Sequence, residues 1–446
     1  MVTQKLTWKD YLVLGSLFFG MLFGAGNLIF PVHLGQLAGQ HWLAAAGGFL
    51  LSGVLLPLMA FLALGLSKTS GLYELTKPLG KWVALPLILL VQLTIGPLLA
   101  TPRTATVSYT IGIAPFLPAD WQGGGLLLYT GLFFGLTYLA MVQENKITAL
   151  IGKYLNPLFL LILAVIFALA FSHPLGQAHH LAAIGTYRPA AFANGFLQGY
   201  NTMDALAGLI FGMTIITAIH ELGVTDRTAV SLATIKSGLV GMGSVAIIYL
   251  GLIWLGATSR AKFSLAANGG ITLAQVAHHY LGQLGDGLLA VLTILACITT
   301  AMGLVAAFAQ ALNQLFPRIS YRTFLRLACG GAFLIANLGL DLIIAWSAPI
   351  LTFLYPLVIT LIVLGILTPW LGLDRISFRL TFRLTALPAF LSLFKDLPPV
   401  LAHTAPIQAL VTVASHWLPW YSLGFAWLPF TCLGLLLSGL LKLRRA

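Results

Sequence analysis

The sequence predicts an all-α integral membrane protein with about twelve transmembrane helices. Of its 446 residues, 59% are hydrophobic and only 8% are charged, whereas ordinary soluble domains carry about 25% charged residues. Charge-free runs such as 121–143, 237–259 and 287–317 reach the ~20 residues that a helix needs to cross a bilayer. A β-barrel would show alternating segments of ~10 residues instead, so we expect a helical bundle.

The apolar runs divide the chain into twelve expected spans within one domain, residues 1–446. They are 11–38, 42–66, 82–113, 122–143, 150–172, 193–219, 233–257, 284–315, 321–338, 343–369, 382–404 and 418–441. The eleventh is the least regular, because Lys395-Asp396 and Pro398-Pro399 interrupt it.

Basic residues give the expected orientation. Alternate loops hold 18 of the 23 lysines and arginines, the other loops hold 4, and Arg103 lies within a span. The positive-inside rule then places both termini in the cytoplasm, and we expect a multi-pass protein of the cell membrane. The formal net charge of +12 is dispersed between spans, so nucleic acid is not an expected partner.

The first span is interrupted at 24–27, within Phe23 to Pro31. Two glycines within three residues weaken a helix, and Asn27 can bond to backbone groups and compete with the helical ladder. A broken helix in lipid is tolerated where protein or a water-filled cavity satisfies the freed backbone. The interruption is therefore a candidate ligand site, although the glycines also permit close helix packing.

A second interruption, Gly199 to Asp204, breaks the sixth span. Paired interrupted helices in corresponding positions of two halves point to a transporter site. We expect a first repeat at about 8–172, a second at about 193–369, and two additional helices at about 382–441. The half-helix beginning near Asn27 favours a carboxylate, and carbonyls near Gly199 favour an ammonium or metal cation.

The third and eighth spans occupy equivalent places in such halves. Pro97 and Pro102 are expected to distort the third, and Arg103 must face a cavity, a partner or the surface. Thr299 and Thr300 could help to coordinate Na⁺, or could bond back to their own helix. The three cysteines are expected to be buried thiols. The histidines of the long loops 173–192 and 258–283 are more simply explained as solvated than as metal ligands.

Together these stretches resemble the bacterial branched-chain amino acid:cation symporter family along nearly the whole chain. The matching stretches are 26–31, 96–108, 194–204, 300–304, 320–323 and 337–340. The resemblance implies a LeuT-type core of five-plus-five inverted repeats with discontinuous helices 1 and 6. It also implies uptake of leucine, isoleucine and valine driven by Na⁺, or by H⁺ in some relatives, with no other cofactor.

The resemblance also implies site residues. The implied substrate residues are Ala25, Gly26, Asn27, Gly199, Tyr200, Asn201, Thr202 and Asp204. The implied Na⁺ residues are Gly20, Phe23, Ala296, Thr299 and Thr300. Arg103 is left with a coupling or a structural role. Family members often carry a glutamate where this chain has Thr110, which puts any coupling role of that position in doubt.

Three other functions are weighed against a branched-chain symporter. Another small amino acid or a nucleobase would fit the same core. An intramembrane enzyme would need a catalytic cluster, but the expected spans carry few charges, chiefly Arg103 and Asp204. A channel would show rings of charge or a filter loop, and neither is found. Membrane lipid is the expected surrounding, and the sequence does not determine the oligomeric state.

Overall fold

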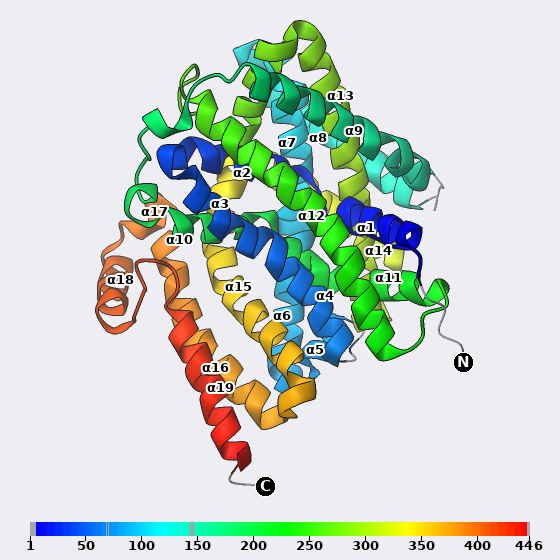
Figure 1. Ribbon diagram of the computed structural model, residues 1–446, viewed down its shortest axis with the longest axis vertical. Helices are drawn as coiled ribbons and strands as arrows, with labels where there is room; N and C mark the ends of the chain where they lie inside the picture. Colours follow the sequence, from blue (N-terminus) through cyan, green and yellow to red (C-terminus); the bar gives the residue numbers. More distant parts are fainter. Residues whose placement is uncertain (1–5, 68, 70, 143–146, 444–446) are drawn as a thin grey trace.

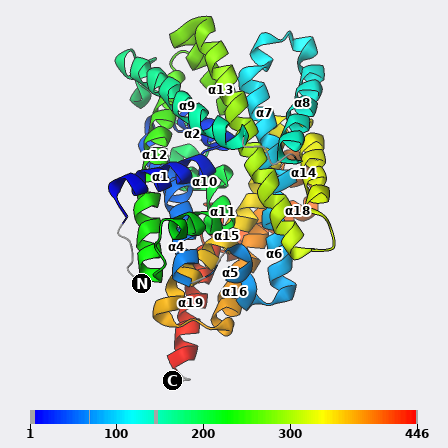
Figure 2. The same ribbon diagram turned by 90° about the vertical axis from the view of Figure 1, so that its right-hand side faces the viewer.

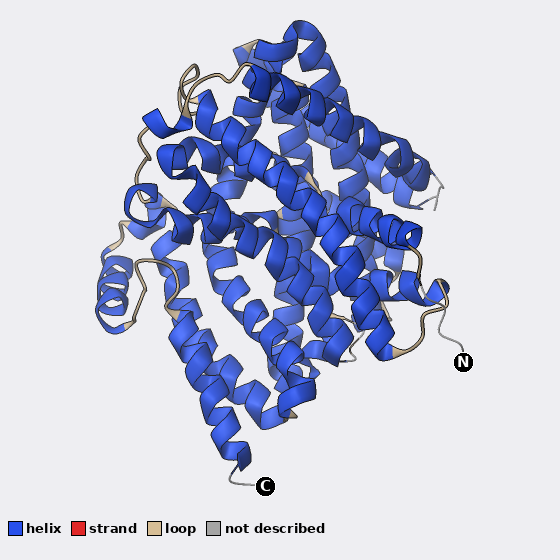
Figure 3. Cartoon of the chain, in the orientation of Figure 1, coloured by secondary structure: helices blue, strands red, loops and turns tan. Residues whose placement is uncertain are grey.

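The computed structural model describes residues 6–67, 69, 71–142 and 147–443, and all regular structure in these ranges is helical (Figures 1 and 3). The helices are α1 Trp8–Leu22, α2 Ala25–Ala38, α3 Trp42–Leu50, α4 Leu56–Ser67, α5 Leu72–Thr76, α6 Lys81–Leu93, α7 Ala100–Gly112, α8 Gln122–Val142, α9 Ile147–Ser172, α10 Tyr187–Gly199, α11 Asp204–Glu221, α12 Arg227–Ser259, α13 Gly269–Leu315, α14 Tyr321–Ala336, α15 Leu340–Leu371, α16 Arg375–Leu393, α17 Pro399–Ala402, α18 Ala405–Trp417 and α19 Trp427–Leu443. By length and composition, seven of the described helical segments could each cross a membrane, or eight if one bent pair is counted. The all-α membrane fold is confirmed, and the count of twelve stays a prediction.

Both predicted breaks are present. The first separates α1 from α2 at Phe23 and Gly24, and the Asn27 side chain accepts a hydrogen bond from the Gly24 N–H at 3.1 Å. The second separates α10 from α11 and contains Met203 in the left-handed conformation, with φ of 59°. A non-glycine residue in that region is uncommon, so the surrounding structure must hold this turn in place.

The broken helices lie against partners from the opposite predicted repeat. The halves α1 and α2 both pack on α12, whereas α10 packs on α3 and α11 on α4. Another extensive contact between the two predicted repeats joins α7 to α13. Each broken helix thus packs on helices of the other predicted repeat, which is consistent with the predicted inverted repeat.

Glycines at these contacts allow the helices to touch at the backbone. A Cβ on Gly35 would lie 2.0 Å from the Ile253 carbonyl oxygen, and one on Gly256 would lie 2.0 Å from that of Val32. In the α3–α10 contact, a Cβ on Gly195 would lie 2.0 Å from the Ala45 carbonyl oxygen. Small residues allow such close approach in membrane helix pairs. These contacts fix the position of one half of each broken helix, α2 in the first and α10 in the second.

The third predicted span is bent, as expected, between α6 and α7. Gly96 has non-helical torsions, φ −76° and ψ −122°, and a Cβ there would lie 2.5 Å from the Phe308 ring. Pro102 lies in the first turn of α7, where a missing N–H does no harm. The bend is therefore centred on Gly96 and Pro97, so the expectation that Pro102 also distorts the span is wrong.

One loop assignment is also wrong. The expected loop 258–283 contains the first part of α13, which the Asn268 side chain caps by accepting from two backbone N–H groups. The helix is interrupted at Gly282, with φ of 59°. Short-range capping can nucleate a helix in a polar segment, and hydropathy does not detect it.

The eleventh span was predicted too far along the chain. The helix α16 already begins at Arg375, because the Asp374 side chain accepts from the Ser377 N–H at 2.9 Å. It ends before the charged pair and the two prolines, and α17 and α18 follow. The last helix, α19, begins at Trp427, later than predicted.

Hydroxyl groups join the last two long helices to the core. The Thr360 hydroxyl of α15 donates to that of Thr385 in α16 at 3.2 Å, and Thr385 lies 2.7 Å from Thr431 of α19. Figure 2 shows α16 and α19 side by side at the lower end of the molecule. Hydrogen bonds between helices contribute about 0.6 kcal/mol on average in membranes, so this cluster chiefly fixes register.

Candidate functional site

The two breaks cross at the centre of the bundle and enclose a small cavity. A Cβ on Gly26 would lie 3.4 Å from the Asn201 carbonyl oxygen, and one on Gly24 would lie 3.1 Å from the Thr300 methyl group. The cavity has a volume of about 40 Å³. It is lined by Met21, Leu22, Gly24, Ala25, Gly26, Asn27, Ile95, Ala100, Arg103, Thr104, Thr202, Met203, Asp204, Ala207, Phe211, Thr300 and Leu304. Residues of α1, α2, α7, α11 and α13 thus meet at one place.

A buried hydrogen-bond network joins three helices at this cavity. The Asn27 amide of α2 donates to Asp204 Oδ2 at 2.8 Å and also donates to the Tyr249 hydroxyl of α12. The Tyr249 hydroxyl donates to the same Asp204 oxygen at 3.0 Å. All three residues are at most 2% exposed. Such bonds stabilise the carboxylate, because a buried charge without partners is costly.

The carboxylate of Asp204 is directed between helices and does not cap its own helix. Asp204 is the first residue of α11, as expected, but the N-terminus of α11 has no side-chain capping bond. Two of its side-chain partners, Asn27 and Tyr249, belong to other helices. The geometry therefore gives no support to a purely local capping role.

Arg103 lines the same cavity. Its side chain is 2% exposed, and its guanidinium carbon lies 4.9 Å from the centre of the Phe30 ring. The Nη1 atom is buried and has no hydrogen-bond partner among the described residues. No ion pair within 4.0 Å joins Arg103 to Asp204, so the two side chains share the cavity without pairing.

Of the two threonines of the eighth predicted span, Thr300 lies beside the first break. Both hydroxyls donate to the Ala296 carbonyl oxygen, at 2.8 Å from Thr299 and 2.9 Å from Thr300. Of the two, Thr300 lines the cavity. Back-bonding uses the hydroxyl protons and leaves the oxygen lone pairs of Thr300 available to a ligand. Gly20, at the end of α1, belongs to the last turn, where carbonyls lack intrahelical partners.

The predicted substrate residues divide into two groups. Ala25, Gly26, Asn27, Thr202 and Asp204 all line the cavity. The other three, Gly199, Tyr200 and Asn201, do not line the cavity.

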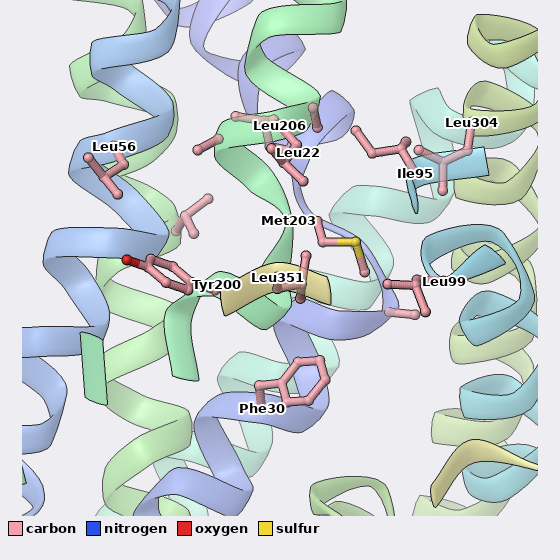
Figure 4. Packing of buried hydrophobic residues seen from close by; sticks show 14 of the residues in the cluster. Leu22, Phe30, Leu56, Ile95, Leu99, Tyr200, Met203, Leu206, Leu304 and Leu351 are labelled. Carbon is pink, nitrogen blue, oxygen red and sulfur yellow. The ribbon is translucent and has the colours of Figure 1, made fainter. Parts of the chain in front are cut away.

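Local contacts explain where these three residues pack instead. The ring of Tyr200 stacks on that of Tyr355 with centroids 4.1 Å apart. In Figure 4 the Tyr200 ring lies at the left, whereas Met203 and Leu304 lie farther to the right. The side-chain oxygen of Asn201 accepts from Ser347, and a Cβ on Gly199 would lie 2.0 Å from the Ser52 hydroxyl. These three residues therefore pack on the side of the second break that faces away from the cavity.

Two site residues escaped the sequence reasoning. Tyr249 completes the Asp204 network, and Phe30 covers the Arg103 guanidinium. The sequence signal for Tyr249 is weak, because a single tyrosine in the apolar run 237–259 also fits ordinary packing. Phe30 lies in α2, just after the recognised first break, but resembles any other apolar residue there.

Histidines and cysteines form no metal centre in the described ranges, where no group of three His, Cys, Asp or Glu side chains could hold an ion. His278 contacts Asp286 at 2.6 Å, and the Lys262 amine lies 3.0 Å from a His279 ring nitrogen. Cys297 and Cys329 are buried free thiols, as expected, but Cys432 is exposed on α19. The prediction that all three are buried is therefore wrong.

Comparison with known proteins places this site in a family. The profile of the family described as "Branched-chain amino acid transport protein" matches residues 7–444. This chain belongs to that family. It is therefore a transporter and not an enzyme.

Curated relatives resemble the transporter over their whole length. It is 38% identical to the branched-chain amino acid permease BrnQ of Lactobacillus delbrueckii subsp. lactis, over 99% of this chain and 100% of that protein. It is 36% identical to the permease BraB of Bacillus subtilis, over 95% and 93% of the two chains. It is also 36% identical to BrnQ of Escherichia coli K12, over 96% and 94%.

Solved transporter structures share the fold at low identity. Mhp1 in its inward-facing conformation matches with a TM-score of 0.59 and 13% identity, over 91% of both chains. MhsT in complex with L-phenylalanine matches with a TM-score of 0.56 and 15% identity, over 98% of this chain and 100% of that one. The fold expected from the resemblance is confirmed.

Proposed function

We propose that this transporter imports leucine, isoleucine and valine across the cell membrane in symport with Na⁺, by alternating access. The family supports the substrate class, and so do the relatives that are named branched-chain amino acid permeases. The observation that carries the proposal is the central cavity, where two helix breaks, one acidic and one basic side chain meet.

The cavity wall suits a zwitterion with an apolar side chain. Its charged members are Arg103 and Asp204. The apolar members are Met21, Leu22, Ile95, Met203, Phe211 and Leu304. A polar or charged side chain would lose its hydration there without gaining partners, which is costly, so lysine and glutamate should be poor substrates.

The small size of the cavity supports alternating access. At about 40 Å³ it holds a few water molecules, whereas ligand pockets usually measure about 300–1,000 Å³. The helices that line it must therefore separate before an amino acid can enter. The two breaks are suitable pivots, because their backbones lack a continuous helical ladder.

Two coupling ions are compatible with the site. In the Na⁺ hypothesis, carbonyl oxygens at the end of α1, from Gly20 to Phe23, combine with the hydroxyls of Thr299 and Thr300. The proximity of Thr300 to Gly24 supports it, although the Ala296 carbonyl already accepts two hydroxyls. In the H⁺ hypothesis, the buried carboxylate of Asp204 gains and loses the proton. We favour Na⁺ because Thr300, one of the proposed ligands, lies beside Gly24 at the first break.

The decisive experiment is leucine uptake into proteoliposomes with a Na⁺ gradient or a pH gradient imposed separately. Na⁺ symport predicts accumulation with the Na⁺ gradient alone, and accumulation with the pH gradient alone would establish H⁺ coupling. Isoleucine and valine should compete for one saturable site. Equal competition by lysine, glutamate or a nucleobase would refute the proposed substrate class.

The orientation is part of the proposal. The 18-to-4 division of basic residues supports cytoplasmic termini through the positive-inside rule. The segment holding α17 and α18 would then lie outside the cell. In Figure 1, α19 runs to the lower end of the molecule, whereas α17 and α18 project at its left.

A further inference from the structure

The inference concerns Arg103 and rests on the proposed function. Arg103 lies on α7 just beyond the bend at Gly96 and Pro97. Because of that bend, α7 contributes Ala100, Arg103 and Thr104 to the central cavity. An ionisable residue inside a membrane protein is costly and usually functional.

The environment of Arg103 is incomplete without an anion. The face of the Phe30 ring lies against it, with the ring centre 4.9 Å from the guanidinium carbon. The buried Nη1 atom has no hydrogen-bond partner among the described residues. A ring face attracts a cation but does not satisfy the five N–H donors of a guanidinium.

The other charge of the cavity does not fill this role. The Oδ2 atom of Asp204 accepts from Asn27 and Tyr249, and no ion pair within 4.0 Å joins it to Arg103. An acid and a base that face one cavity without touching match the two ends of a zwitterion.

We propose that the Arg103 guanidinium is the receptor for the carboxylate of the transported amino acid. A guanidinium binds a carboxylate through two parallel hydrogen bonds, a geometry that an ammonium cannot reproduce. The N-terminus of α2 adds to the site, because Ala25 and Gly26 line the same cavity and the first N–H groups of a helix have no intrahelical acceptor. The substrate ammonium then faces Asp204.

The test compares leucine with leucinamide, which keeps the ammonium and the side chain but lacks the carboxylate. Equilibrium binding to the purified full-length protein is measured for the wild type, Arg103→Gln, Arg103→Lys and the control Arg326→Gln. Arg326 is a suitable control because it lies on α14, and its exposed side chain donates to the Tyr138 hydroxyl, so its loss removes the same charge far from the cavity.

The expected result is specific to the carboxylate. Arg103→Gln should weaken leucine binding by about 10- to 100-fold, as for lost charge-assisted hydrogen bonds, and leave leucinamide binding unchanged. Arg103→Lys should lose part of the preference for leucine, and Arg326→Gln should keep all of it. A folded Arg103→Gln protein with the wild-type ratio of leucine to leucinamide affinity would overturn the proposal.

Two further outcomes are separated by the same series. If Arg103→Gln does not fold, Arg103→Lys decides, and an unchanged leucine preference in it overturns the inference. If the wild type binds neither leucine nor its competitors isoleucine and valine, the proposed function itself has failed. The inference about Arg103 and the proposed function are therefore refuted by different measurements.

Discussion

Replacing Asp204 with asparagine tests whether its charge is needed for transport. The side chain joins α11 to α2 and α12 through one oxygen, which accepts from Asn27 at 2.8 Å and from Tyr249 at 3.0 Å. Asparagine has nearly the same shape and keeps an oxygen that can accept both bonds. The substitution therefore removes the negative charge and retains the connection between the helices.

The stability change can be worked out from these two bonds. Hydrogen bonds to a charged group contribute about 1.5–3 kcal/mol each and neutral ones about 0.5–1.5 kcal/mol, so the two weakened bonds cost about 2–3 kcal/mol together. Replacing the carboxylate with a neutral amide recovers part of the about 2.5–3.5 kcal/mol that a charged side chain costs in the membrane interior on insertion scales. The two effects partly offset each other, and Asp204→Asn should fold with close to wild-type stability.

Transport should respond differently. The asparagine variant should reach the membrane in normal amounts, melt in detergent near the wild-type temperature, and lose gradient-driven leucine uptake. Asp204→Ala should be less stable, because Asn27 and Tyr249 lose their shared acceptor. The matched control is Asp226→Asn, since the exposed Asp226 caps α12 by accepting from the Ala229 N–H and asparagine caps about equally well. Near-normal uptake by Asp204→Asn would refute the reasoning, because the carboxylate would then be only a connector.

Three further predictions concern the ion, the packing and the topology. Thr300→Ala should raise the Na⁺ concentration for half-maximal uptake several-fold, because one ligand oxygen is lost, whereas Thr300→Ser keeps the oxygen and should not. Unchanged Na⁺ dependence in the alanine variant would exclude Thr300 as a Na⁺ ligand. Gly195→Val should abolish folding, since even the Cβ of the new side chain would lie 2.0 Å from the Ala45 carbonyl oxygen. The control Gly287→Val should fold, because nothing lies within 4 Å of a Cβ at that position. A monodisperse, active Gly195→Val protein would contradict the packing. Reporter fusions after Ala446 and within 405–417 should lie on opposite sides of the membrane, and the same side for both would mean that the last helices do not cross as proposed.

Local sequence determined much of the fold and half of the site. Hydropathy alone identified the membrane class, because a charge-free run of sufficient length has few alternatives to a membrane helix. The glycines and asparagine at Gly24 to Asn27 marked the first break, because their effect on a helix is local. Helix ends set by capping side chains, such as Asp374 and Asn268, were misplaced, because one hydrogen bond outweighs average hydropathy there.

Only the tertiary structure decided which side chains meet. Tyr249, an inconspicuous residue of an apolar run, reaches Asp204 because reciprocal glycine contacts hold α12 against α2. Tyr200, inside a recognised break, lies away from the cavity because Tyr355 stacks on its ring. The direction of a side chain depends on the rotation of its helix and on neighbours far away in the chain. The sequence of one helix therefore locates a break, whereas packing between helices determines which of its residues face the cavity.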